Sequence, residues 1–221
     1  MTAKPTDSMI LGSCLVSFLP EVSAQDRSDI LDVLLLAELR ASAQYHRHKQ
    51  WEAWIGAYQA GLSESGLTAQ GSLAPEPVSV RSQERFRREA AKLLTAIHPQ
   101  QLAVVAESAL DQMFNSAHAQ SFFKHWFGFN AGRSDSFQVV PCQPTTSGII
   151  NIAACGLEMV TRTRARLPII GIPQNPFQYE MTLRFRGEGF VFNSEIYARH
   201  RARVRDQLLD ISREIPAPIN L

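Results

Sequence analysis

The pattern of apolar and polar positions divides the chain into a helical first part and a sheet-rich second part. Apolar side chains recur at helical spacing over 24–127, whereas short β-prone runs bounded by Pro, Gly and Asn follow over 136–196. A last helical pattern covers 195–213, and Pro216 and Pro218 end regular structure behind it. The sequence therefore predicts an α+β fold, in which a helical N-terminal half packs on a small, mainly antiparallel β-sheet with a C-terminal helix.

The helical part begins with an uninterrupted pattern that is followed by a loop-like segment. The run 24–61 contains no Pro and can be capped by Ser23, which predicts one long helix or two helices nearly in line. The segment 62–80 is rich in Ser, Gly, Ala and Pro, which predicts a mobile surface loop. Helical spacing resumes at Ser82 and continues to Phe127.

Two strands of the sheet-rich part are expected to form a hairpin. Alternating apolar residues occur before and after the tetrapeptide 186–189, whose two glycines favour a turn. The strand that precedes this tetrapeptide is predicted to start at Tyr179, and an earlier strand is predicted over Ile149–Thr161.

Composition and charge indicate an ordinary globular protein. The chain has 221 residues, of which 45% are apolar and 19% charged, so it fits a single domain, 1–221, with a substantial core. The 22 Lys and Arg residues nearly balance the 21 Asp and Glu residues, so no overall field favours nucleic acid or an anionic membrane. The arginines of 199–205 alternate at every second residue, which spreads their charge around a helix and also argues against nucleic acid. No apolar run reaches the ~18 residues that span a bilayer, so we expect no transmembrane segment and at most peripheral membrane contact.

The N-terminal run Met9–Leu19 has two interpretations. Its length suits the apolar core of a signal peptide, and small residues follow it at 22–24. However, Lys4 is the only early positive charge, and Asp7 cancels it. We therefore expect this run to be buried as the first core element of a cytoplasmic protein, with secretion as the alternative.

The three cysteines, Cys14, Cys142 and Cys155, are an odd number without CxxC spacing, so neither a disulfide framework nor a zinc ribbon is predicted. Cys142 is the main candidate for chemistry. Pro141 cannot donate to a sheet ladder, so Cys142 is expected where a strand yields to a loop. The turn at 144–148 could then supply amides for an oxyanion site. The alternative is that Cys142 is an inert buried thiol.

A nucleophilic cysteine needs a base or a positive field, because the thiolate is the attacking form. His125 is the preferred base, since its predicted helix ends just before the strand that leads to Cys142. Asn130 or Asp135 could orient the imidazole. A structural or solvent-facing His125 is the alternative.

An apolar chamber is predicted around these residues. Aromatic side chains gather just before the sheet-rich part and could line a pocket for an acyl chain, namely Phe122, Phe123, Trp126 and Phe127. Cys155 lies in an apolar strand with small neighbours, which leaves room either for a ligand channel or for a packed helix. Core filling is the alternative for the aromatic residues.

No metal or cofactor site is predicted. His46 and His48 are two residues apart on the predicted helix and would point in different directions, which argues against a joint metal site. The sequence contains no HExxH, GxSxG, P-loop or GxGxxG motif.

A helical N-terminal half, a small mixed β region, no cofactor motif and apolar-flanked cysteines together resemble the Erwinia virulence factor (Evf) family. The resemblance centres on the region around Cys142. It implies an unusual α/β fold and a fatty acyl chain linked as a thioester to a buried cysteine in an apolar channel. On this resemblance Cys142 would be the acylated residue, with Cys155 as a substitute.

Three functions follow from these observations. The first is an acyl-handling protein that binds a fatty acyl chain or acyl thioester, with acyltransferase or thioesterase activity and no cofactor besides a covalently bound fatty acid. The second is a non-enzymatic bacterial virulence or effector protein that acts on a membrane or protein partner. The third is a small-molecule enzyme with a polar cleft that includes Arg133, Asp135, His125 and Glu158. The first leads narrowly, because a thiol in apolar surroundings suits acyl chemistry.

Overall fold

The computed structural model of the protein describes residues 7–80, 134–161 and 181–214, together with isolated helical positions between 85 and 111. The strands are β1 (Asp7–Leu11), β2 (Cys14–Phe18), β3 (Thr68–Leu73), β4 (Val78–Val80), β5 (Ser134–Pro144), β6 (Ile149–Thr161) and β7 (Met181–Asn193). The helices are α1 (Ala24–Gln44), α2 (Trp51–Glu64), α6 (Ser194–Tyr197) and α7 (Arg201–Glu214).

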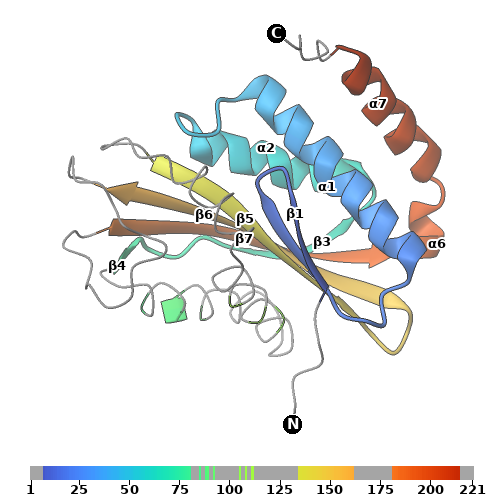
Figure 1. Cartoon of the computed structure of the whole chain (residues 1–221), viewed down its shortest axis with the longest axis horizontal. Coiled ribbons are helices and arrows are strands. Elements are labelled where there is room, and N and C mark those ends of the chain that lie inside the picture. The colour runs from blue at the N-terminus through green and yellow to red at the C-terminus, as the bar shows by residue number, and fades with distance from the viewer. Residues whose placement is uncertain are drawn as a thin grey trace, which may run out of the picture.

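The strands form one sheet of the order β1-β2-β5-β6-β7-β3, and β4 pairs with β7 along the same edge as β3. The pair β2–β5 is parallel and the other pairs are antiparallel. Helices α1, α2 and α7 lie together on one side of this sheet (Figure 1). The expected α+β class and the mainly antiparallel sheet are therefore confirmed.

Both faces of the central strands are buried. Even-numbered residues such as Val140, Ile152 and Phe190 join the core beneath α1 and α2. Odd-numbered residues such as Cys155 and Leu183 face the other way and are also buried. Burial on both faces explains why β6 reads as a nearly continuous apolar run rather than as an alternating one.

The prediction that 24–61 forms one helix, or two nearly in line, is wrong. The chain reverses at 45–50, and α1 and α2 pack side by side as an antiparallel hairpin (Figure 1). The indole nitrogen of Trp54 donates a hydrogen bond to Ser42 Oγ over 3.0 Å, which joins the start of α2 to the end of α1. The reversal places the apolar residues of both helices over one sheet face. The predicted cap is confirmed, because Ser23 Oγ accepts a hydrogen bond from the Asp26 amide.

The prediction of a mobile loop over 62–80 is also wrong. Helix α2 continues to Glu64, and β3 and β4 then pair with the edge of β7. Strand β3 is almost entirely exposed and so carries no apolar alternation. This strand is held by backbone hydrogen bonds to β7, and a Ser- and Gly-rich sequence gives no sign of such pairing.

Two further boundaries differ from the predictions. The expected hairpin at 186–189 is absent, because β7 runs unbroken and Gly187 and Gly189 pair with β6 on one side and β3 on the other. The expected helix over 195–213 is divided at residues 198–200, where the His200 amide donates to the Tyr197 carbonyl in a turn. By contrast, the second part of the N-terminal apolar run is buried as expected, as β2 in the interior of the sheet, whereas its first part lies in the partly buried edge strand β1.

Candidate functional site

Cys142 lies inside β5 and not where the strand ends, so that expectation is wrong. Its side chain is fully buried on the helix-facing side of the sheet, and Cys142 pairs with Phe18 of β2 and Ile152 of β6. The ladder with β6 is interrupted between Val139 and Cys142, which lets an interior strand accommodate Pro141 without its N–H. Burial raises the pKa of the Cys142 thiol far above its ordinary value.

Two amides of the turn after Cys142, where an oxyanion site was expected, are engaged within the turn. The Thr145 amide donates to the Ile149 carbonyl over 2.7 Å, and the Gly148 amide donates to the Thr145 carbonyl over 3.2 Å. Both amides therefore close the hairpin between β5 and β6. Their use in the turn leaves neither of them to stabilise a developing charge.

Cys155 lies on the opposite face of the sheet from Cys142. It pairs with Val139, an odd-numbered residue of β5, and it is fully buried. Burial raises the pKa of this thiol as well. The two cysteines therefore do not share one chamber. The neighbouring Gly156 faces α2, since a Cβ atom there would lie 2.6 Å from Ile55 Cδ1, and this confirms close helix packing at that position.

The predicted base and aromatic pocket lie outside the described residues. This applies to His125, Phe122, Phe123, Trp126 and Phe127. Their relation to Cys142 therefore stays a prediction.

A buried polar cluster surrounds Cys14, the first residue of β2. The sulfur of Cys14 lies 3.5 Å from Tyr58 Oη and 3.5 Å from Gln138 Oε1. It also lies 3.7 Å from Glu38 Oε2. Burial, and secondly the charge of Glu38, raise the pKa of the Cys14 thiol well above its ordinary value. Burial and the neighbouring Cys14 likewise raise the pKa of Tyr58.

Glu38 of α1 joins this cluster to the turn between β1 and β2. Its Oε1 accepts hydrogen bonds from the Ser13 amide over 3.0 Å and from the Ser13 hydroxyl over 2.8 Å. Arg47 lies 3.7 Å from the same carboxylate. The contacts fix the β1–β2 hairpin against α1 and hold a protonated thiol among hydrogen-bond partners. This arrangement stabilises the fold and does not activate a nucleophile.

Sequence reasoning missed this cluster. The available signal was Glu38, an acidic residue beside the apolar stripe of α1. Its hydrogen-bond partner Ser13 and the other cluster members Tyr58 and Gln138 lie far from it in the sequence, so only the tertiary structure brings them together.

Ion pairs account for several charged residues that the sequence singled out. Glu158 of β6 is buried and pairs with Arg184 of β7 over 3.2 Å, so it braces two strands. Asp29 of α1 is fully buried and receives hydrogen bonds from Arg201 over 2.7–3.1 Å, and Arg205 lies 3.6 Å away. These two arginines, four residues apart on α7, thus face α1 and are not spread evenly into solvent.

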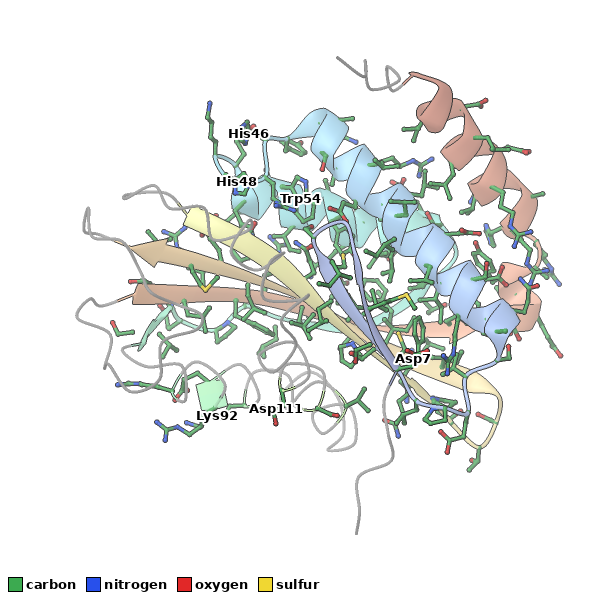
Figure 2. The ribbon with its side chains drawn as sticks, viewed as in Figure 1. Asp7, His46, His48, Trp54, Lys92 and Asp111 are labelled. Atoms are coloured by element: carbon green, nitrogen blue, oxygen red, sulfur yellow. The ribbon has the colours of Figure 1, made fainter. Side chains whose placement is uncertain are left out.

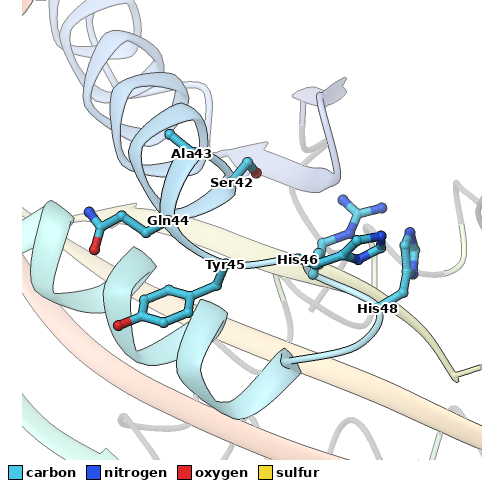
Figure 3. Close-up of a pocket in the computed structure, with 7 residues that line it drawn as sticks. Ser42, Ala43, Gln44, Tyr45, His46 and His48 are labelled. Carbon is cyan, nitrogen blue, oxygen red and sulfur yellow. The ribbon is translucent and has the colours of Figure 1, made fainter.

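The turn between α1 and α2, which we call the hairpin tip (45–50), carries an open hollow of about 400 Å³. It is lined by Ser42, Ala43, Gln44, Tyr45, His46, Arg47 and His48 (Figure 3). The imidazole rings of His46 and His48 lie edge to face, with their centroids 5.9 Å apart. Both residues are exposed at one end of the helical layer (Figure 2).

The expectation that His46 and His48 lie on a helix and point apart is wrong, because residues 45–50 form a turn. His46 is held at its backbone: its carbonyl accepts hydrogen bonds from the Lys49 and Gln50 amides, and its amide donates to Gln50 Oε1. The tip is therefore an ordered, cationic, solvent-facing structure. Within the described ranges no three His, Cys, Asp or Glu side chains gather as a metal ion would require.

Comparisons with known proteins add information about the fold. No protein-family model matches the chain, and no curated protein matches its sequence. A solved structure titled "delta-endotoxin" aligns over 89% of this chain and 95% of its own, at 11% identity and a TM-score of 0.49. The activated Cyt2Ba monomer from Bacillus thuringiensis subsp. israelensis aligns over 80% of this chain and 95% of its own, at 10% identity and a TM-score of 0.50. This chain shares its fold with Cyt2Ba.

At 10% identity the likeness to Cyt2Ba concerns the fold alone. Neither structure bears on the resemblance to the Evf family, which stays a prediction. Of the helices in the described part of the chain, none combines the length and the apolar character that crossing a membrane requires.

Proposed function

We propose that this protein is a non-enzymatic effector that binds an anionic phospholipid membrane through the hairpin tip. The observation that carries the proposal is the run His46, Arg47, His48 and Lys49, which stands at the end of the helical layer around an open hollow. Anionic lipid surfaces attract basic side chains, at about 1 kcal/mol for each Lys or Arg near the surface.

The charge of the tip is local. The whole chain has a formal net charge of +1, so no overall field brings it to a membrane. At the tip, Glu38 lies close to Arg47, whereas Lys49 is exposed on the solvent side. Attraction therefore acts over about one Debye length, ~8 Å at physiological salt, and orients the molecule with the tip toward the lipid.

The described thiols support a binding function over thiol catalysis. A catalytic cysteine works as a thiolate in a partly exposed, electropositive environment. Cys14, Cys142 and Cys155 are all buried, and burial raises the pKa of each. A fatty acyl thioester at Cys142 remains a separate proposal. Intact mass before and after neutral hydroxylamine tests it, because only a thioester adduct would be released.

Cyt2Ba was solved as an activated monomer, and we extend the monomeric state to this chain. A monomer leaves the tip free to meet a surface.

Co-sedimentation with vesicles tests the proposal. We expect binding to vesicles of phosphatidylcholine with phosphatidylglycerol, weak binding to phosphatidylcholine alone, and release at high salt. Lys49→Glu removes one attraction and adds one repulsion, so its lipid affinity should fall at least fivefold. Arg199→Glu is the matched control, since Arg199 is exposed near α6 and away from the tip. Equal losses in both variants, or equal binding to both vesicle types, would contradict the proposal.

A further inference from the structure

The hollow at the hairpin tip combines groups that suit one ligand chemistry. Two imidazoles lie 5.9 Å apart between their centroids, and Arg47 lines the same hollow. Figure 3 shows the rings of His46 and His48 next to each other on one side of the turn, whereas Gln44 and Tyr45 point to the other side. Guanidinium and imidazolium N–H groups form short, charge-assisted hydrogen bonds to phosphate oxygens.

A metal ion fits these residues less well. Structural and catalytic zinc sites use three or four protein ligands, and the described residues around the tip supply only two imidazoles. The guanidinium of Arg47 would also oppose a cation in the same hollow.

We propose that this hollow binds the phosphate group of an anionic phospholipid, and that protonation of His46 and His48 strengthens the binding in mildly acidic solution. The inference rests on the proposed function. It adds that the lipid phosphate is the group bound and that pH regulates the binding. Imidazoles change charge between about pH 5 and pH 8, whereas a lipid phosphodiester stays anionic across that range. Acidification therefore increases the attraction from the protein side alone.

Charged side chains of the tip, α1 and α2 lie near the two imidazoles. Arg47 and Lys49 belong to the same turn, and Glu38 of α1 faces Arg47 over 3.7 Å. Glu52, in the first turn of α2, faces Arg184 of β7 over 3.8 Å. Glu38 and Glu52 each face a cation, and the imidazoles are the side chains of the tip whose charge changes between about pH 5 and pH 8.

The test compares vesicle affinity at pH 7.5 and pH 5.5 for the unchanged chain and for a His46→Gln/His48→Gln variant. Vesicles contain phosphatidylcholine with or without phosphatidylglycerol. We expect the affinity of the unchanged chain for anionic vesicles to rise about tenfold on acidification, and the double variant to bind as at pH 7.5 under both conditions. His200→Gln, in the turn between α6 and α7, is the control and should retain the acid response.

The outcomes separate the two proposals. An equal acid response in the double variant overturns this inference and leaves the proposed function in place. Absence of binding to anionic vesicles at both pH values overturns the proposed function itself. Calorimetry with inorganic phosphate alone forms the last arm: submillimolar binding with the same histidine dependence would assign the hollow to free phosphate and overturn the lipid assignment. Circular dichroism of the double variant checks that it folds.

Discussion

Gly12 shows most directly how single residues hold the N-terminal hairpin in place. It lies in the turn between β1 and β2 with a φ of 55°, a left-handed conformation that side chains disfavour. A Cβ atom at this position would lie 2.5 Å from Glu38 Oε2. The carboxylate cannot retreat without losing its hydrogen bonds to Ser13. Two independent constraints thus require glycine here.

A matched pair of substitutions separates these constraints. Gly148 also has a positive φ, 75°, but a Cβ atom there would meet nothing within 4 Å. Gly148→Ala should therefore cost only the left-handed conformation, about 1 kcal/mol of unfolding free energy. Gly12→Ala should cost about 3 kcal/mol, because the contact with Glu38 is also disrupted. Urea denaturation measures both, and equal losses would show that Glu38 does not constrain the turn.

The buried thiols predict a fall in stability above neutral pH. Burial raises the pKa of Cys14, Cys142 and Cys155 in the folded protein. The folded state therefore holds these protons more tightly than the unfolded chain does. Their contribution is complete below the unfolded thiol pKa, about 8.5, and is lost as the pH rises above it, at up to about 1.4 kcal/mol per pH unit for each thiol.

Urea denaturation between pH 7 and pH 10 measures this dependence. Cys155→Ala removes one titrating thiol and should reduce the slope by about a third if the three contribute equally. Ellman's reagent should react slowly with the native protein. After unfolding it should react with three thiols. A flat stability profile, or rapid reaction of a native thiol, would contradict the burial that the structure shows.

Among the elements, α7 is attached to the rest of the helical layer by the buried side chain of Val204 and by ion pairs to α1. Asp29 of α1 is fully buried beneath Arg201 and Arg205, while the nearby Asp32 is partly exposed and pairs with Arg205. Removing the buried partner leaves two arginines without their shared acceptor, whereas removing the exposed one changes little. We therefore expect Asp29 to contribute much more than Asp32 to the attachment of α7.

Hydrogen exchange of Asp29→Asn tests this attachment. Amides of α7 should exchange at least about tenfold faster than in the unchanged chain, and those of β6 should be unaffected. Asp32→Asn, the control, should leave α7 protected. If both variants exchange alike, the ion pairs with Asp29 do not anchor the helix.

The elements that could be predicted from the sequence are those whose burial is visible in it. Strand β6 occupies the predicted range Ile149–Thr161, and Ser23 caps α1 as its hydroxyl allows. Strand β3 could not be predicted, because an exposed edge strand is ordered by its backbone. Pro141 led to the wrong prediction that Cys142 lies at a strand end. The ladder between β5 and β6 is interrupted at Pro141, so an interior strand tolerates the proline.

The candidate site was predictable only in part. The chain reversal after Tyr45 turns His46 and His48 toward each other, and helical spacing alone places them apart. The contact of Cys14 with Glu38 and Tyr58 needs the β1–β2 hairpin to be in place beneath two helices. Such contacts depend on the whole fold and leave little trace in local sequence.

At the scale of the whole molecule, the hairpin tip and the β5–β6 turn lie at opposite ends. Strands β2 and β5 run parallel and in register where Phe18 faces Cys142, so both end near the start of α1. Helix α1 then runs in the opposite direction, so the hairpin tip lies at the other end of the helical layer (Figure 1). A molecule that binds a membrane with its tip must therefore keep the β5–β6 turn in water.

The most direct measurement compares two environment-sensitive fluorophores on exposed cysteines. Gln44→Cys places one at the end of α1, directly before the hairpin tip, and Thr146→Cys places the other in the β5–β6 turn, neither with a change in charge. The unsubstituted chain is the labelling blank, because its cysteines are buried. On mixing with anionic vesicles, we expect a blue shift of the fluorophore at residue 44 and no shift at residue 146. A shift at residue 146 alone, or at neither position, would contradict membrane binding through the hairpin tip.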